Sequence, residues 1–65
     1  MPIVIVEMWE GRTLDEKKVL VKGITEAFEK IGNLPDTVHI VLKENSMSNW
    51  AKGGRLSSER NSGGK

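Results

Sequence analysis

The segment TLDEKKVLVKGITEAFEKIGN, residues 13–33, lies between two short apolar runs, IVIVEM at residues 3–8 and VHIVL at residues 38–42. It opens with a capping box, in which the Thr13 hydroxyl accepts from the backbone amide of Glu16 while the Glu16 side chain reaches back. The segment therefore predicts one capped helix of about 18 residues, which spans roughly 27 Å.

The apolar residues of this segment recur at helical spacing. On a 3.6-residue wheel, five of them fall within one arc of about 100°: Leu20, Ile24, Ala27, Phe28 and Ile31. Gly32-Asn33 supplies a left-handed stop and Pro35 prevents continuation. A glycine inside the helix, Gly23, lowers helix stability by about 0.8–1 kcal/mol relative to alanine. Two explanations for this glycine are equally good: close approach of another helix or subunit, or drift at a tolerant position.

The two apolar runs predict two strands. Residues 3–8 are typical of a strand buried on both faces over most of its length. A strand, a helix and a strand form a right-handed βαβ unit with parallel strands, so Pro2 and Val38-His39 should lie at one end of the sheet. One helix leaves a sheet face and two edges open, which predicts self-association.

The remainder of the chain predicts a polar loop at residues 45–49 and a small hairpin around Gly53-Gly54. Trp50, between the two, should pack against another group. The fold class is therefore α/β (α+β), a single βαβ unit with parallel strands plus a short C-terminal hairpin. We expect one domain over residues 1–60 and a flexible polar tail over residues 61–65.

Composition excludes several classes of function. The 65 residues contain no cysteine and a single histidine, which excludes disulfides, thiolate metal sites and multi-histidine metal sites. Ten basic and nine acidic residues are interleaved along the chain, which disfavours nucleic acid and anionic membranes as partners. No apolar run is long enough to span a membrane and the N-terminus lacks signal-peptide features, so we expect a cytoplasmic protein.

The N-terminal pair Met1-Pro2 contains the first candidate catalytic group. Removal of Met1 would leave Pro2 with a free secondary amine held rigidly by its ring. An α-amino group titrates near about 7.7–8.0 when unperturbed, and burial or a nearby cation brings such a group into the range of an effective general base. Pro2 is therefore a candidate catalytic base.

Taken together, Met1-Pro2-Ile3, the turn Glu10-Gly11-Arg12 before a capped helix, the βαβ order, and Asn49-Trp50 followed by Gly53-Gly54 resemble the 4-oxalocrotonate tautomerase family. The resemblance covers about residues 1–60 and implies a tautomerase-like fold. It also implies small homohexamers or heterohexamers, usually trimers of dimers, that need no metal or organic cofactor.

The resemblance implies an enol/keto tautomerase, an isomerase acting on small carboxylates such as 2-hydroxymuconate-like or enolpyruvate-like acids. Pro2 would be the base and Arg12 would bind and polarise the substrate, because its planar fork binds a carboxylate and stays charged. Trp50 would form an aromatic wall, and Trp9 either lines the pocket or packs in an interface. Without the resemblance, Arg12 would be a solvated loop arginine paired with Glu10 or Asp15.

Two departures from the family pattern suggest alternatives. His39 stands where well-studied members carry a second substrate-binding arginine, if one residue is deleted between Pro35 and Val38. His39 either donates a single hydrogen bond to a substrate carbonyl or is an inert residue. The histidine in place of the expected arginine motivates the alternative function, a non-catalytic binding or assembly protein. The related hydratases and dehalogenases use an arginine and a glutamate where this chain has Trp9 and Lys52, so that activity ranks lower.

Overall fold

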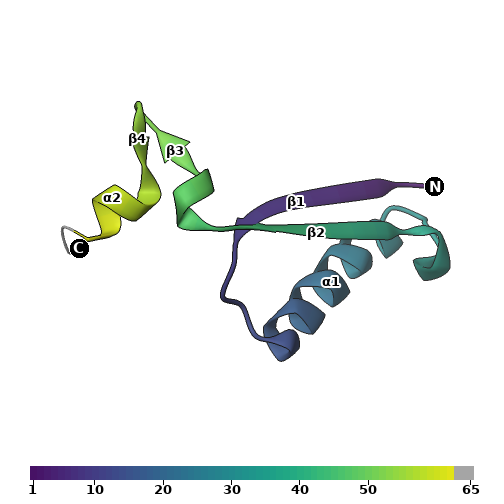
Figure 1. Ribbon diagram of the computed structural model, residues 1–65. Coiled ribbons are helices and arrows are strands. Elements are labelled where there is room, and N and C mark those ends of the chain that lie inside the picture. Colours follow the sequence, from purple (N-terminus) through teal and green to yellow (C-terminus); the bar gives the residue numbers. More distant parts are fainter. Residues whose placement is uncertain (63–65) are drawn as a thin grey trace.

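The computed structural model describes residues 1–62, and the side chains of residues 1–59. Strand β1 (Ile3–Trp9), helix α1 (Leu14–Glu29) and strand β2 (His39–Asn45) follow one another, with a short 3₁₀ turn, η1 (Pro35–Thr37), before β2. The strands are parallel and α1 crosses one side of them (Figure 1). The βαβ unit predicted from the sequence is confirmed.

The N-terminus of α1 has the predicted capping box. The backbone amide of Glu16 donates to the Thr13 hydroxyl at 3.1 Å, and the backbone amide of Thr13 donates to a Glu16 carboxylate oxygen at 3.0 Å. Two backbone amides that the helix itself cannot pair are thereby satisfied. The cap therefore sets the residue at which the loop after β1 ends and the helix begins.

The C-terminal end of α1 comes earlier than the apolar pattern suggested. Gly32 has a φ of 103°, and the amide of Asn33 donates to the Phe28 carbonyl at 3.1 Å, as in a Schellman motif. Ile31 therefore lies past the end of the helix and is 75% exposed. Ala27 is exposed as well. Neither residue is therefore buried in this chain, although the helical wheel placed both in the apolar arc, and a core role for them is wrong.

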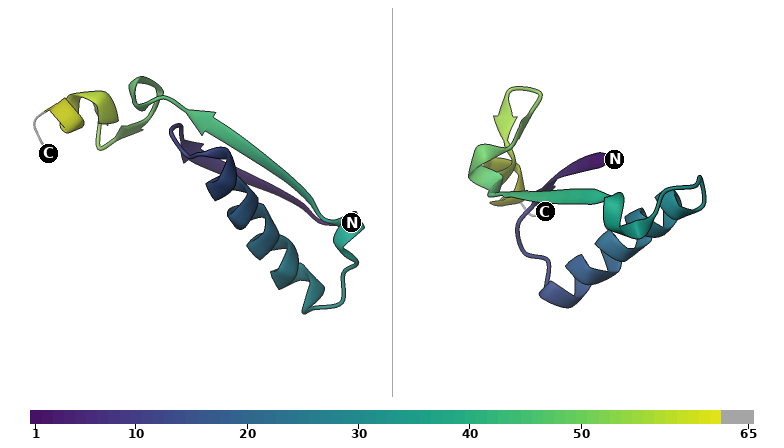
Figure 2. Two further views of the ribbon diagram at one scale, coloured as in Figure 1. Left: turned by 90° about the horizontal axis from the view of Figure 1, so that it is seen from below. Right: turned by 90° about the vertical axis from the view of Figure 1, so that its right-hand side faces the viewer.

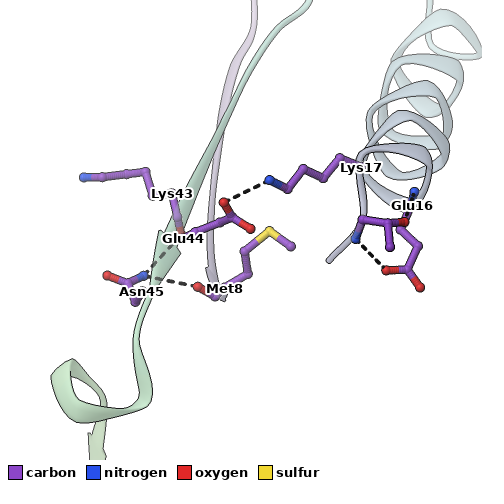
Figure 3. A network of polar contacts seen from close by, with 7 residues as sticks. Met8, Glu16, Lys17, Lys43, Glu44 and Asn45 are labelled. Carbon is purple, nitrogen blue, oxygen red and sulfur yellow. Dashed lines mark hydrogen bonds and ion pairs between the residues drawn. The ribbon is translucent and has the colours of Figure 1, made fainter. Parts of the chain in front are cut away.

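The interior of the chain is the layer between α1 and the sheet. The half-buried side chains of the strands alternate with exposed ones, as expected for a sheet covered on one side. The half-buried apolar side chains of this layer, on the covered side of the strands and on the helix, are Val4, Val6, Met8, Ile40, Leu42, Leu20, Val21, Ile24 and Phe28. Lys17 of α1 also reaches Glu44 of β2, with 2.9 Å between Nζ and the carboxylate (Figure 3).

The other side of the sheet has no cover. We call it the uncovered face; it contains Ile3, Ile5 and Val41, which are 61%, 58% and 46% exposed, and the ion pair between Glu7 and Lys43. The expectation that β1 is buried on both faces is therefore wrong for a single chain, because α1 covers only one of them. Among the described residues no hydrophobic side chain is fully buried.

The chain is elongated and has too much surface for a self-sufficient domain. Its accessible surface is 5062 Å², whereas a compact monomer of this mass exposes about 4100 Å². Its radius of gyration is 15.3 Å, against about 11 Å for a compact chain of this length. These values, with the apolar uncovered face, indicate that the chain self-associates.

A C-terminal arm follows β2. It consists of a 3₁₀ turn, η2 (Met47–Asn49), the antiparallel strands β3 (Ala51–Lys52) and β4 (Arg55–Leu56), and a short helix, α2 (Ser57–Ser62). Gly53 and Gly54, with φ of 62° and 80°, make the turn, so the predicted hairpin is confirmed. The arm projects beyond the ends of β1 and β2 (Figure 2).

Helix α2 is an element that the sequence did not predict. The last two residues of its range fall within the expected tail of residues 61–65, and residues 63–65 of that tail lie outside the described residues. None of the helices within residues 1–62 combines the length and the apolar character that crossing a membrane requires.

Candidate active site

Pro2 and His39 lie together at the start of the parallel sheet. The backbone amide of His39 donates to the Pro2 carbonyl at 2.9 Å, immediately before the pair in which Ile3 lies opposite His39. The structure thus brings together the two residues that the βαβ topology placed at one end. Pro2 is half-buried, whereas Met1 before it is 79% exposed.

Trp9 and Trp50 meet at the opposite end of the sheet. Trp9 is the last residue of β1, and Trp50 lies in the C-terminal arm between η2 and β3. Their ring centroids lie 5.6 Å apart with an interplanar angle of 70°, an edge-to-face contact. The prediction that Trp50 packs on another group is therefore confirmed. Since Trp9 is still 43% exposed, the pair leaves an aromatic surface open.

Arg12 lies in the loop that follows Trp9. Its guanidinium is 3.8 Å from a carboxylate oxygen of Glu16, and the Arg12 side chain is 63% exposed. The sequence suggested Glu10 or Asp15 as structural partners, but the capping-box glutamate takes that place instead. An exposed i,i+4 pair of this kind contributes only about 0.3–0.5 kcal/mol, so an incoming carboxylate can compete for the guanidinium.

An open groove of ≈ 790 Å³ runs between the C-terminal half of β1 and the first turns of α1. Of the predicted site residues, Trp9 and Arg12 line it, whereas Pro2, His39 and Trp50 do not. The complete lining comprises Val6, Met8, Trp9, Glu10, Gly11, Arg12, Glu16, Lys17, Val19, Leu20 and Met47.

Asn45 holds the loop that carries Arg12, a role that sequence reasoning missed. Its side-chain amide donates to a Glu7 carboxylate oxygen at 3.0 Å. It also donates to the Lys43 and Met8 carbonyls at 3.2 and 3.4 Å (Figure 3). Its own carbonyl accepts from the Glu10 amide at 3.0 Å. The polar loop predicted from residue 45 therefore begins one residue later, because Asn45 is the last residue of β2.

The five predicted site residues thus form two groups rather than one. At about 3.3 Å of rise per residue, the seven steps from Pro2 to Trp9 extend roughly 23 Å. Pro2 and His39 lie at one end of that length, and Trp9, Arg12 and Trp50 lie at the other. A small acid cannot touch both groups of a single chain.

The comparisons with known proteins agree on the family. A family model described as tautomerase enzyme matches residues 2–60, and the chain belongs to this family. A probable tautomerase of Halalkalibacterium halodurans is 38% identical over 61 residues, which cover 92% of this chain and 100% of that protein. One of Listeria monocytogenes is 38% identical over 55 residues, which cover 83% and 90%.

Solved structures give the same assignment. A structure from a study of the 4-oxalocrotonate tautomerase isozymes of Methylibium petroleiphilum has a TM-score of 0.89 and 30% identity, and covers 95% of this chain and 98% of that one. A 4-oxalocrotonate tautomerase homologue of the tomaymycin biosynthetic pathway has a TM-score of 0.88 and 31% identity, with 94% and 95% covered. The chain therefore has the 4-oxalocrotonate tautomerase fold and is a tautomerase, an isomerase.

Proposed function

We propose that this chain is a cofactor-independent enol/keto tautomerase acting on 2-hydroxymuconate-like or enolpyruvate-like acids, with the amine of Pro2 as general base. The family match over residues 2–60, which begins at Pro2 itself, carries the proposal. Arg12 binds the substrate carboxylate, Trp50 and Trp9 form the aromatic wall, and His39 donates one hydrogen bond to a carbonyl.

The proposed reaction moves one proton and leaves the atoms of the substrate otherwise unchanged. The neutral Pro2 amine takes the proton from the enol oxygen, which leaves an ammonium group beside a dienolate. The guanidinium of Arg12 stabilises the negative charge that develops. The ammonium then returns the proton to carbon, which gives the conjugated ketone and regenerates the free amine.

Met1 must be removed for this chemistry. While Met1 is attached, the Pro2 nitrogen belongs to a tertiary amide and has no basic lone pair. Met1 precedes β1 and is 79% exposed, so its loss removes no packing from the sheet. The Pro2 carbonyl keeps its bond from the His39 amide in either form, because that bond does not involve the nitrogen.

A complete site then requires two copies of the chain. An antiparallel arrangement of two sheets would place Pro2 of one copy beside Trp9 and Arg12 of the other. A two-fold axis would repeat the contact and create two equivalent sites. The 23 Å between the two groups and the excess accessible surface both favour this arrangement. A homohexamer built as a trimer of dimers is the assembly that the family resemblance suggests.

The decisive test compares wild type with Pro2→Ala in the ketonisation of 2-hydroxymuconate and of phenylenolpyruvate, with the uncatalysed rate subtracted. The intact mass of each sample must first show that Met1 is absent. We expect Pro2→Ala to lose most of the turnover while size-exclusion chromatography shows the wild-type assembly. Retained turnover in that variant would rule out the amine as the base.

The same two substrates distinguish a tautomerase from a non-catalytic binding or assembly protein. If neither substrate decays faster than in buffer while the Pro2 amine is free, the chain is a binding or assembly protein that keeps the fold. Hydration or dehalogenation of small unsaturated acids is disfavoured because Trp9 and Lys52 replace the arginine and glutamate that activity would use. A cytoplasmic location remains a prediction from the sequence.

A further inference from the structure

The guanidinium of Arg12 already has an anionic neighbour within its own chain. The Nη1 nitrogen of Arg12 lies 3.8 Å from the Oε2 oxygen of Glu16, and both residues line the groove. Both side chains are more than half exposed to solvent. The ion pair therefore lies where the proposed function binds the substrate carboxylate.

The other oxygen of the Glu16 carboxylate is held by the helix cap. Oε1 accepts from the backbone amide of Thr13 at 3.0 Å, and the Glu16 amide donates to the Thr13 hydroxyl at 3.1 Å. An exposed ion pair usually loses side-chain entropy when it forms, but here the capping box has already ordered the glutamate. Glu16 therefore cannot swing away from a second anion at Arg12 without losing its hydrogen bond to the cap.

The other cation that lines the groove, Lys17, is paired more tightly than Arg12. Its Nζ lies 2.9 Å from a carboxylate oxygen of Glu44 (Figure 3), and the two side chains are only 28% and 31% exposed. A partly buried pair is screened less by water and salt than an exposed one. Arg12 is therefore the groove-lining cation that an incoming carboxylate reaches more readily.

We propose that Glu16 is a built-in competitor, which weakens the binding of substrate and product carboxylates to Arg12. The inference rests on the proposed tautomerase function. When a substrate carboxylate binds the guanidinium, two negative charges face the same cation. Like unit charges about 4 Å apart in water change a binding equilibrium by about 5-fold. Substrate and product carry the same carboxylate, so Glu16 weakens the binding of both and favours release of the product.

The kinetic test uses Glu16→Gln, which removes the charge and keeps a side chain that also forms capping boxes. We expect KM for phenylenolpyruvate to fall by about 3- to 5-fold at low ionic strength, because the repulsion is removed. The substrate carboxylate stays charged throughout the reaction, so kcat should remain within about 2-fold of wild type. In about 1 M salt, where the Debye length is about 3 Å, KM of the two proteins should differ by less than about 2-fold.

Two matched controls separate the charge of Glu16 from the stability of the helix. Glu29→Gln removes the same charge from an exposed position roughly 20 Å further along α1, and it should keep the wild-type KM. Thr13→Ala weakens the cap but retains the Glu16 carboxylate, so it should melt at a lower temperature with the wild-type KM. An unchanged or raised KM in Glu16→Gln, or an equal fall in either control, would overturn the proposal.

A second measurement needs no turnover. Phenylpropionate, an unreactive acid with one carboxylate, is titrated into each protein by isothermal calorimetry. Glu16→Gln should bind it about 3- to 5-fold more tightly than wild type, and this gain should vanish when Arg12→Ala is added to both proteins. Equal affinities of wild type and Glu16→Gln, or a gain that persists without Arg12, would overturn the proposal. If the gain is found but wild type turns over neither 2-hydroxymuconate nor phenylenolpyruvate, the proposed function fails while the competition at Arg12 stands.

Discussion

Replacing Ile5 with aspartate tests whether the uncovered face is an interface between copies. Ile5 lies at the centre of β1 opposite Val41, and it is 58% exposed in the single chain. Full burial of such a side chain contributes about 1.5–3 kcal/mol, so covering the remaining surface contributes about 0.9–1.7 kcal/mol per copy. A carboxylate at the same place would cost several kcal/mol if it were covered.

Ile5→Asp should therefore shift the assembly to smaller species at micromolar concentration, as measured by sedimentation velocity. Ile5→Val keeps an apolar side chain and should retain most of the assembly. Lys22→Asp places the same carboxylate on the charged side of α1 and should leave the assembly unchanged. An Ile5→Asp protein with the wild-type sedimentation coefficient would show that the uncovered face is open to water in the native particle and is not an interface.

Two further substitutions probe α1. Thr13→Ala removes the hydroxyl that accepts from the Glu16 amide at 3.1 Å, and it should lower the free energy of unfolding by about 1 kcal/mol in urea denaturation; an unchanged midpoint would show that the capping box is dispensable. Gly23→Ala meets nothing within 4 Å in the chain and should raise the free energy of unfolding by about 0.8–1 kcal/mol. Dissociation of the assembly in that variant would instead show that another copy approaches Gly23.

The local elements could be predicted because their determinants lie close together in the sequence. The capping box needs only Thr13 and Glu16, and the hairpin needs only Gly53-Gly54 between two short strands. The parallel pairing follows from chirality and the length of the connecting helix.

Features that depend on distant contacts were missed or misplaced. Helix α2 has no apolar periodicity, and it begins at Ser57, whose amide is held by the Trp50 carbonyl. Ile31 matched the apolar arc, but the backbone had already left the helix at that point. The anchoring role of Asn45 depends on acceptors that are up to 38 residues away in the sequence.

The separation of the site into two groups was implicit in the sequence. Pro2 comes directly before an extended run and Arg12 comes directly after it, so the two cannot meet within one chain. The family resemblance assigned Pro2 and Arg12 to one active site, although the length of β1 separates them within a chain. Which surfaces of two copies meet cannot be worked out from periodicity, because it is decided by the shapes of assembled chains.

If each active site combines Pro2 of one copy with Arg12 of another, two inactive variants should complement each other within one assembly. Pro2→Ala and Arg12→Ala are each purified, shown to be inactive in ketonisation, and then mixed, unfolded and refolded together. If two-fold pairs assemble at random, about a quarter of the sites receive both native residues, and the mixture should recover about that fraction of wild-type activity. A mixture that stays as inactive as its two components would show that Pro2 and Arg12 of different copies do not share an active site.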